Sequence, residues 1–365
     1  MTFLNIFRSE VKYQLKSIVF WIFIMVTIFF VMTQFGFYSG SEVLAPQPGQ
    51  SYYGRSSEVT EESELQGIYL YLTRDISRGQ TLKYGFMINK DEKIRPEAKE
   101  AMLELQSRIQ DGDISYQEFN KMANQVDELL GGNTIYNEEN RKRYLSRELN
   151  YEEAKAIFDR KVNEAGLTNA YGRLFADYLG ISAGFFPVFL AAFLLLKDRK
   201  NKMIELVQVR KVRPFTYITA KFTAITALVF LFYLLLSLQP TYAFYRIAAA
   251  NAWDFHFFGF IKYVVYWILP TLMFTIAIGM TIAEIANRGV VAILVQIFIW
   301  FNSISVLSGD YSLSKHIIRF NSSSSYDLYL KSISAIRTNR IFYIVLSILI
   351  LFICSWIWKK KEVLS

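Results

Sequence analysis

Six long stretches of almost uncharged, apolar residues dominate the pattern of hydrophobic and polar positions along the chain. They cover residues 18–37, 178–196, 222–238, 263–283, 290–307 and 341–358. A membrane-spanning helix needs about 20 mostly apolar residues to cross the hydrocarbon core, so we expect six transmembrane helices. The alternative, a large soluble core, would leave too little sequence to cover six such helices.

The residues before the first apolar stretch, 1–17, follow a different pattern. Apolar residues recur there at helical spacing, with basic residues on the adjoining face: Leu4, Phe7, Val11 and Leu15 beside Arg8, Lys12 and Lys16. This pattern is typical of an amphipathic helix that lies flat in the headgroup region. A straight extension of the first span is the alternative.

A long polar segment, residues 38–176, separates the first two apolar stretches and predicts a mainly helical domain. Two apolar stripes at helical spacing lie within it, and residues 40–60 have the composition of a loop. Helix boundaries are indicated by Pro96, by the pairs Ser115/Glu118 and Asn150/Glu153, and by Gly131, Gly132 and Gly166. The predicted fold is therefore an all-α membrane protein with an inserted helical domain.

Charge is divided unevenly along the chain of 365 residues. Residues 39–176 carry 23 acidic and 18 basic side chains, whereas the remainder carries a net charge of +13 within a total of +8. Basic clusters flank the apolar stretches at residues 8–16, 197–221 and 359–361. Because basic residues favour the cytoplasmic side, we expect both termini and loop 197–221 in the cytoplasm and residues 38–176 outside. The excess of basic residues thus indicates a protein embedded in a membrane rather than one that binds nucleic acid.

Several chemical motifs are absent or incomplete. Asp111 and Asp113 resemble the start of a calcium loop, but the glycine and glutamate that such a loop requires are replaced by Tyr116 and Met122. The two histidines, His256 and His316, fall in separate predicted outside loops, which argues against a zinc site. Asp177 and Glu284 are the acidic residues that adjoin the spans, both at span ends. We therefore predict no catalytic or metal site.

The phosphate-binding pattern G-x-x-x-x-G-K-[ST] does not occur in the sequence. Because that loop cradles nucleotide phosphates in many ATPases, the chain is not expected to hydrolyse ATP by that route. We predict a protein that is not itself an enzyme. Any ATP-driven function requires a second polypeptide.

Two features inside the predicted spans bear on helix packing. Gly180 and Gly184 form a G-x-x-x-G pattern, which allows close approach of another helix. Pro187 and Pro270 lie within the second and fourth spans, where a kink is expected.

The loop at residues 197–221 carries the most informative pattern. It is strongly basic with one apolar side, which predicts a short amphipathic helix that presents Glu205, Arg210 and Arg213. The loop resembles that of ABC-2 type exporter permeases, in which Glu-Leu is followed by a proline and then a lysine. Here Glu205-Leu206 is followed by Lys221 sixteen residues after Glu205, although Lys211 replaces the proline. The amphipathic start, six spans and cytoplasmic termini are also similar to that family.

The resemblance implies the function of an exporter permease that works with a cytoplasmic ABC ATPase dimer and a second permease. ATP and magnesium would be bound by the ATPase, with no cofactor on this chain, and the exported substrate is not indicated. The implied contacts to the ATPase are Lys202, Met203, Glu205, Leu206, Val209, Arg210 and Arg213. The basic loop residues could instead attract only anionic membrane lipid.

Two other functions remain open from the sequence. One is a force-transmitting ABC membrane protein, which would have four spans. The other is a receptor, signalling or immunity protein whose outside domain, residues 38–176, binds a ligand.

Overall fold

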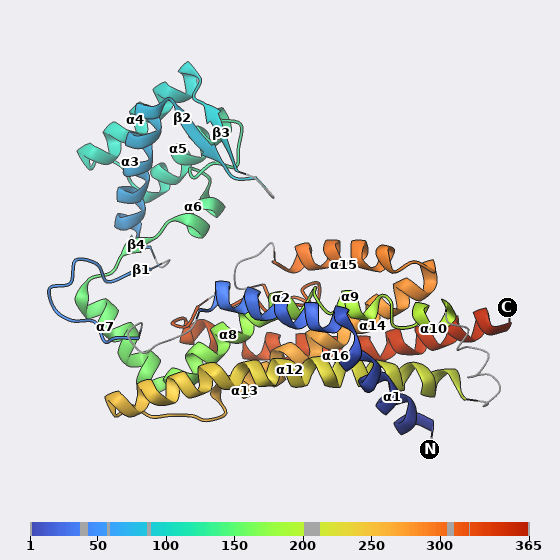
Figure 1. Cartoon of the computed structure of the whole chain (residues 1–365). Coiled ribbons are helices and arrows are strands. Elements are labelled where there is room, and N and C mark those ends of the chain that lie inside the picture. The colour runs from blue at the N-terminus through green and yellow to red at the C-terminus, as the bar shows by residue number, and fades with distance from the viewer. Residues whose placement is uncertain are drawn as a thin grey trace. The chain divides into compact units, whose positions relative to one another are not determined.

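The computed structural model forms two compact units, which are described separately (Figure 1). One unit, here called the helical unit, comprises Met1–Leu44 and Ile157–Ser365; the other, the inserted unit, comprises Ala45–Ala156. Residues 157–176, which we assigned to the polar domain, belong to the helical unit. The structure describes residues 2–36, 43–56, 59–85, 89–200, 212–304, 310–320 and 322–363.

The helical unit consists of helices of very different lengths. Its elements are α1 (Thr2–Lys16), α2 (Ile18–Gln34), the end of α7 (Tyr151–Asp159), η1 (Arg160–Glu164), α8 (Leu167–Ala183), α9 (Val188–Ala191), α10 (Leu196–Lys200), α12 (Pro214–Asn251), α13 (Gly259–Tyr263), η2 (Val264–Ile268), α14 (Leu269–Ala286), α15 (Gly289–Ile304) and α16 (Tyr326–Val363). Long helices lie side by side along most of the unit (Figure 1).

Four helical stretches are long and apolar enough to cross a membrane: Leu167–Lys200, Pro214–Asn251, Gly259–Ala286 and Tyr326–Lys361. A fifth candidate is the pair α1 and α2, which meet at a bend of 68°. The chain thus has the helices expected of a multi-pass membrane protein. The remaining apolar stretch forms α15, whose 16 residues give a length of about 24 Å, short of a full hydrocarbon core.

Two helices extend well beyond the predicted spans. α12 continues past Pro240 to Asn251, and α16 begins at Tyr326, so both predicted outside loops are partly helical. Residues 241–251 contain Ala, Tyr and Arg without a helix-breaking residue, which explains why the helix persists after the apolar stretch has ended. Hydropathy marks where a span ends but not where its helix ends.

Both prolines inside the predicted spans coincide with interruptions of the α-helix. α8 ends at Ala183, and α9 starts directly after Pro187. The π-helix η2 directly precedes α14, in which Pro270 occupies the first turn. A proline lacks a backbone donor and its ring crowds the preceding turn, and a π-helical turn widens the backbone at that place.

The inserted unit packs short helices around one apolar core, with two small antiparallel strand pairs. Its elements are β1 (Arg55–Ser56), α3 (Glu61–Arg78), β2 (Gln80–Lys83), β3 (Lys90–Lys93), α4 (Pro96–Asp111), α5 (Tyr116–Leu129), α6 (Glu138–Tyr144) and β4 (Arg147–Glu148). β1 pairs with β4, and β2 pairs with β3. The predicted helical character is confirmed, including Pro96 in the first turn of α4 and the capping box of Ser115 and Glu118.

Buried ion pairs and hydrogen bonds support the core of the inserted unit. The Arg141 side chain is fully buried, and its Nε lies 2.7 Å from Oε1 of Glu64. Asp75 is 1% exposed and accepts hydrogen bonds from Tyr136 at 3.0 Å and Thr81 at 2.7 Å. Thr81 lies on β2, whereas Tyr136 and Arg141 follow α5, so the polar groups join α3 to β2 and to the segments after α5.

Candidate functional site

The predicted ATPase-contact loop is only partly within the described residues. Lys202, Met203, Glu205, Leu206, Val209 and Arg210 lie outside them. Arg213 is exposed and stands at the N-cap of α12, directly before Pro214. Proline suits the first turn of a helix because the amide hydrogen there has no partner within the helix.

The helices at the two ends of this loop are joined by a buried ionic cluster, here called the loop-base cluster: Glu10, Lys197, Asp198, Tyr217 and Lys221. Lys197 on α10 lies 2.5 Å from one carboxylate oxygen of Glu10, and Lys221 on α12 lies 2.6 Å from the other. Lys221 also pairs with Asp198 at 2.6 Å, and the Tyr217 hydroxyl donates to the same Asp198 oxygen. The cluster therefore connects α1, α10 and α12.

Burial makes this cluster structurally important. Glu10 is 4% exposed and the Lys221 side chain 6%. Two carboxylates face two ammonium groups, so the charges of the cluster balance. A buried charge without its partner is strongly unfavourable, which favours an arrangement in which α1, α10 and α12 move together.

A second ionic contact lies beside the loop-base cluster. Arg199 of α10 pairs with Glu284 of α14, whose side chain is fully buried. Lys361 near the end of α16 donates to the backbone carbonyl of Glu284 and to Oδ1 of Asn287. A lysine at these last carbonyls caps α14 favourably, so the contact ties α10, α14 and α16 together.

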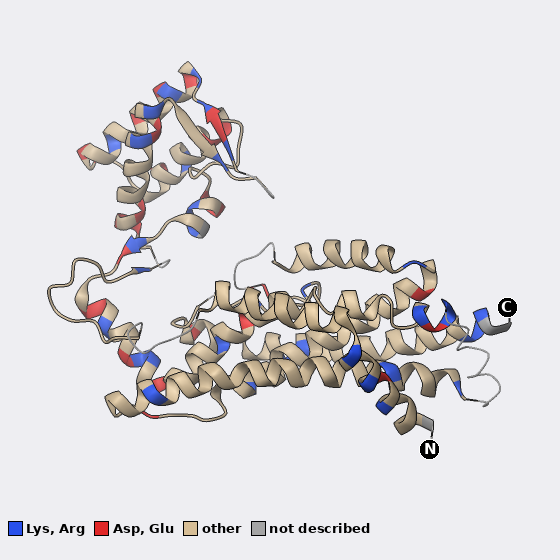
Figure 2. Ribbon diagram, in the orientation of Figure 1, with Lys and Arg blue, Asp and Glu red and all other residues tan. Residues whose placement is uncertain are grey.

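Basic residues gather where these contacts form. Figure 2 shows Lys and Arg on α1, around α10 and near the C-terminal end of α16, whereas the long helices are mostly uncharged along their length. α1, α10, the start of α12 and the end of α16 thus lie at one end of the helical unit.

A different polar cluster surrounds residues 311–320 of the helical unit, here called the inserted segment; these residues are not part of the inserted unit. This segment has no regular helix, yet Ile317, Ile318 and Phe320 are almost fully buried among the helices. Asp177 of α8 accepts a hydrogen bond from Arg319 at 2.7 Å and one from the backbone amide of Phe320. We predicted Asp177 at a span end without identifying its partner.

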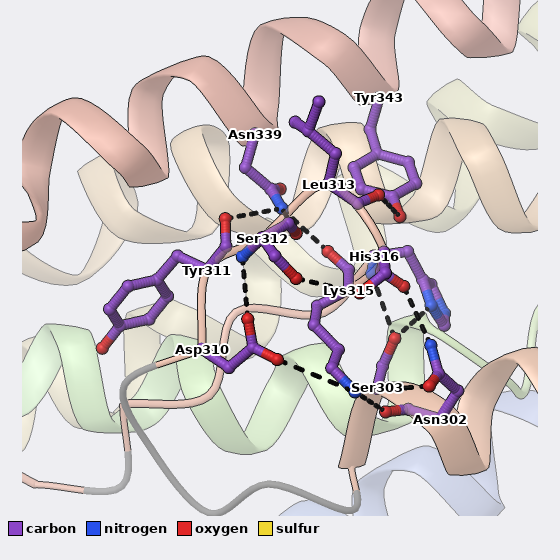
Figure 3. Close-up of polar contacts among 11 residues, drawn as sticks. Asn302, Ser303, Asp310, Tyr311, Ser312, Leu313, Lys315, His316, Asn339 and Tyr343 are labelled. Atoms are coloured by element: carbon purple, nitrogen blue, oxygen red, sulfur yellow. Dashed lines mark hydrogen bonds and ion pairs between the residues drawn. The ribbon is translucent and has the colours of Figure 1, made fainter.

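The backbone of the inserted segment is held by side chains of neighbouring helices (Figure 3). Asn339 of α16 donates to the carbonyls of Ser312 and Lys315 at 2.7 and 2.9 Å, and the Tyr343 hydroxyl donates to that of Leu313 at 2.9 Å. Irregular backbone within a membrane protein needs such internal partners because lipid offers none.

His316 is buried in this segment rather than placed in an exposed loop. Its Nδ1 lies 2.7 Å from Oγ of Ser303, and its Nε2 lies 3.3 Å from the carbonyl of Gly184. Its own carbonyl accepts hydrogen bonds from Thr271 and from the fully buried Arg340. Among the described residues, no group of three or more His, Cys, Asp and Glu is placed to hold a metal ion.

The glycine pair proposed for helix packing faces this segment. A Cβ atom on Gly184 would lie 2.5 Å from Cδ1 of Ile317, and one on Gly180 would lie 3.1 Å from Cγ2 of Ile317. The small residues therefore make room for an irregular segment of the same chain. Two helix backbones cross closely elsewhere, where a Cβ on Gly172 would lie 2.6 Å from the backbone oxygen of Gly259.

Most residues of both clusters carried no recognisable signal in the sequence. Glu10 was part of an amphipathic helix and Lys197 counted only as a basic loop residue, whereas Lys221 was identified only as the lysine of the pattern that begins at Glu205. Ionisable residues near apolar stretches are expected to have partners, but the sequence does not say which. Comparison of the chain with protein-family models, with curated proteins and with solved structures finds no match.

Proposed function

We propose that the chain is the permease subunit of an ATP-driven exporter and that a cytoplasmic ATPase acts on it through loop 197–221. In this proposal six spans place both termini and the loop in the cytoplasm, and α1 lies in the headgroup region. Residues 38–176 are extracytoplasmic, and a second permease completes the translocation path. The proposal rests on the loop sequence and on the contacts at the base of the loop.

The observation that carries the proposal is the loop-base cluster. A partner that pulls on the loop can move the spans only if the loop ends are rigidly attached to them. Lys197 and Lys221, the first and last residues of the loop, bind the same carboxylate of Glu10. A displacement of the loop would therefore be transmitted to α1, α10 and α12 together.

The first test is co-purification from the native cell. The full chain, carrying an affinity tag, should retain an ATPase with the phosphate-binding pattern that this chain lacks. Exchanging the charges at Glu205→Arg and Arg210→Glu should abolish that retention. The matched control exchanges Glu138→Lys and Lys142→Glu, an exposed pair in the inserted unit, and should retain it. Equal retention by both variants would show that the assigned contact is wrong.

The second test addresses the number of spans, because α15 is short. Reporter domains inserted next to Gly289 and next to Ser324 should report opposite sides of the membrane if α15 crosses it. Reports from the same side would contradict the six-span arrangement. This outcome is independent of whether an ATPase binds.

A further inference from the structure

A cavity of about 1120 Å³ lies between α10 and the start of α15. Four basic residues line it, Lys197, Arg199, Lys200 and Arg288, together with apolar side chains. The described residues that line it include no carboxylate. The cavity is therefore complementary to a negatively charged ligand with an apolar part.

Two of these cations are available to a ligand. Lys197 and Arg199 are paired with Glu10 and Glu284. Lys200 and Arg288 are exposed, and within the described part of the chain neither forms an ion pair. The described residues thus provide no carboxylate partner for either charge.

The start of α15 adds backbone donors at the same place. Gly289 is the first residue of this 16-residue helix and lines the cavity. The first amide groups of a helix have no partner within it and attract anions, phosphate in particular. A Cβ atom on Gly289 would lie 2.6 Å from the ring of Phe193, so the absence of a side chain lets the helix begin directly against the cavity wall.

An apolar stripe leads away from the cavity along α15. Val290 and Leu294 line the cavity, and Phe298 continues the same face; these residues are 60%, 52% and 75% exposed. Residues four apart lie on one face of a helix, and the stripe rises about 12 Å along the axis. This geometry suits hydrocarbon chains that extend from a headgroup at the helix start.

We propose that this cavity binds an anionic phospholipid, with its phosphate at Lys200, Arg288 and the first amides of α15 and its acyl chains along the stripe. Basic pockets between membrane helices favour such headgroups. The proposal requires that α15 contact lipid, but it does not depend on an ATPase. Unlike the general attraction of basic residues to an anionic membrane, this site positions both the headgroup and the acyl chains of one lipid.

The experiment measures lipid binding to the purified full chain in neutral detergent by native mass spectrometry. Phosphatidylglycerol is titrated against phosphatidylcholine with the same acyl chains, and the wild type should bind the former more tightly. Each basic residue near a lipid surface contributes about 1 kcal/mol, so Lys200→Gln with Arg288→Gln should weaken phosphatidylglycerol binding roughly 30-fold. The matched control, Lys359→Gln with Lys360→Gln, removes two exposed cations outside the cavity and should bind normally.

Competition separates a lipid from a free phosphate. Glycerol phosphate without acyl chains should fail to displace phosphatidylglycerol at matched concentration, and Leu294→Ser should weaken lipid binding. Displacement by glycerol phosphate would overturn the lipid assignment in favour of a small-anion site. Equal binding of the two lipids by the wild type, or equal losses in the cavity and control variants, would overturn the site itself. The wild-type comparison holds even if a variant fails to fold.

Discussion

Removing the carboxylate of Glu10 should destabilise the helical unit more than removing one partner of an exposed ion pair does. In Glu10→Gln, Lys197 loses its ion-pair partner and Lys221 keeps only Asp198. Removing one partner from a buried ion pair costs about 3–5 kcal/mol. Because glutamine can still accept hydrogen bonds, we expect the lower end of that range, about 3 kcal/mol.

The assay is thermal unfolding of the full chain in detergent, followed by tryptophan fluorescence, since all six Trp belong to the helical unit. For a unit of this size each kcal/mol shifts the midpoint by about 2–4 °C, so Glu10→Gln should lower it by about 6–12 °C. The matched control is Asp327→Asn, which removes the pair with Arg160 in the same unit. Those side chains are 56% and 50% exposed, and solvent should limit the loss to below about 1 kcal/mol.

A double-mutant cycle tests whether the effect arises from the ion pair. Lys197→Gln removes the other partner, and combining it with Glu10→Gln should cost less than the sum of the two single losses. Contacting residues show coupling energies of about 0.5–3 kcal/mol. Additive losses would refute direct coupling, and a shift for Glu10→Gln no larger than that for Asp327→Asn would refute the importance of the cluster.

Two further predictions concern other parts of the chain. Gly172→Ala should lower the unfolding midpoint because overpacking against the backbone of Gly259 costs about 1–3 kcal/mol. The control is Gly279→Ala, where the nearest neighbour of the added Cβ is a methyl group at 3.0 Å, and this variant should change the midpoint little. Equal midpoints in the two variants would contradict the close crossing. The hydrogen bonds from Arg147 and from the Asn150 amide lower the pKa of Glu153 to about 2. The stability that Glu153 provides is therefore fully present above its unfolded pKa of about 4.3 and is lost as the pH falls through about 2. Because the inserted unit, which contains Glu153, holds no Trp, its unfolding midpoint is followed by circular dichroism. The midpoint difference between wild type and Glu153→Gln should be constant above about pH 5 and should vanish toward the lowered pKa. A difference independent of pH would refute the role of the Glu153 carboxylate.

Local sequence signals predicted the helices well where a cap or an apolar stripe is present. Ser115 and Glu118 form the expected capping box at the start of α5, and Asn150 and Glu153 exchange hydrogen bonds at the start of α7. These interactions join residues three positions apart, so their partners are visible in the sequence. The two-residue strand pair β1 and β4 was missed because it joins residues 55 and 148, which share no local pattern.

The candidate site could not be predicted for the same physical reason. Glu10 contacts residues that follow it by 187 and 211 positions. No periodicity connects positions so far apart, and composition assigns all the lysines of the loop the same role. Segment 311–320, the inserted segment, was equally hidden, because the side chains that satisfy its backbone lie on α8, α14, α15 and α16.

The structure divides the basic residues around the loop into two groups that the sequence cannot distinguish. Lys197, Arg199 and Lys221 are committed to carboxylates within the chain, so replacing them alters the helical unit itself. Lys200 and Arg288 are exposed and form no ion pair within the described residues, so replacing them should leave the fold intact. A variant of the first group that loses function would therefore test the proposed transmission through the helices, whereas a variant of the second group would test the proposed lipid site. Charge alone would have assigned both groups to the membrane surface.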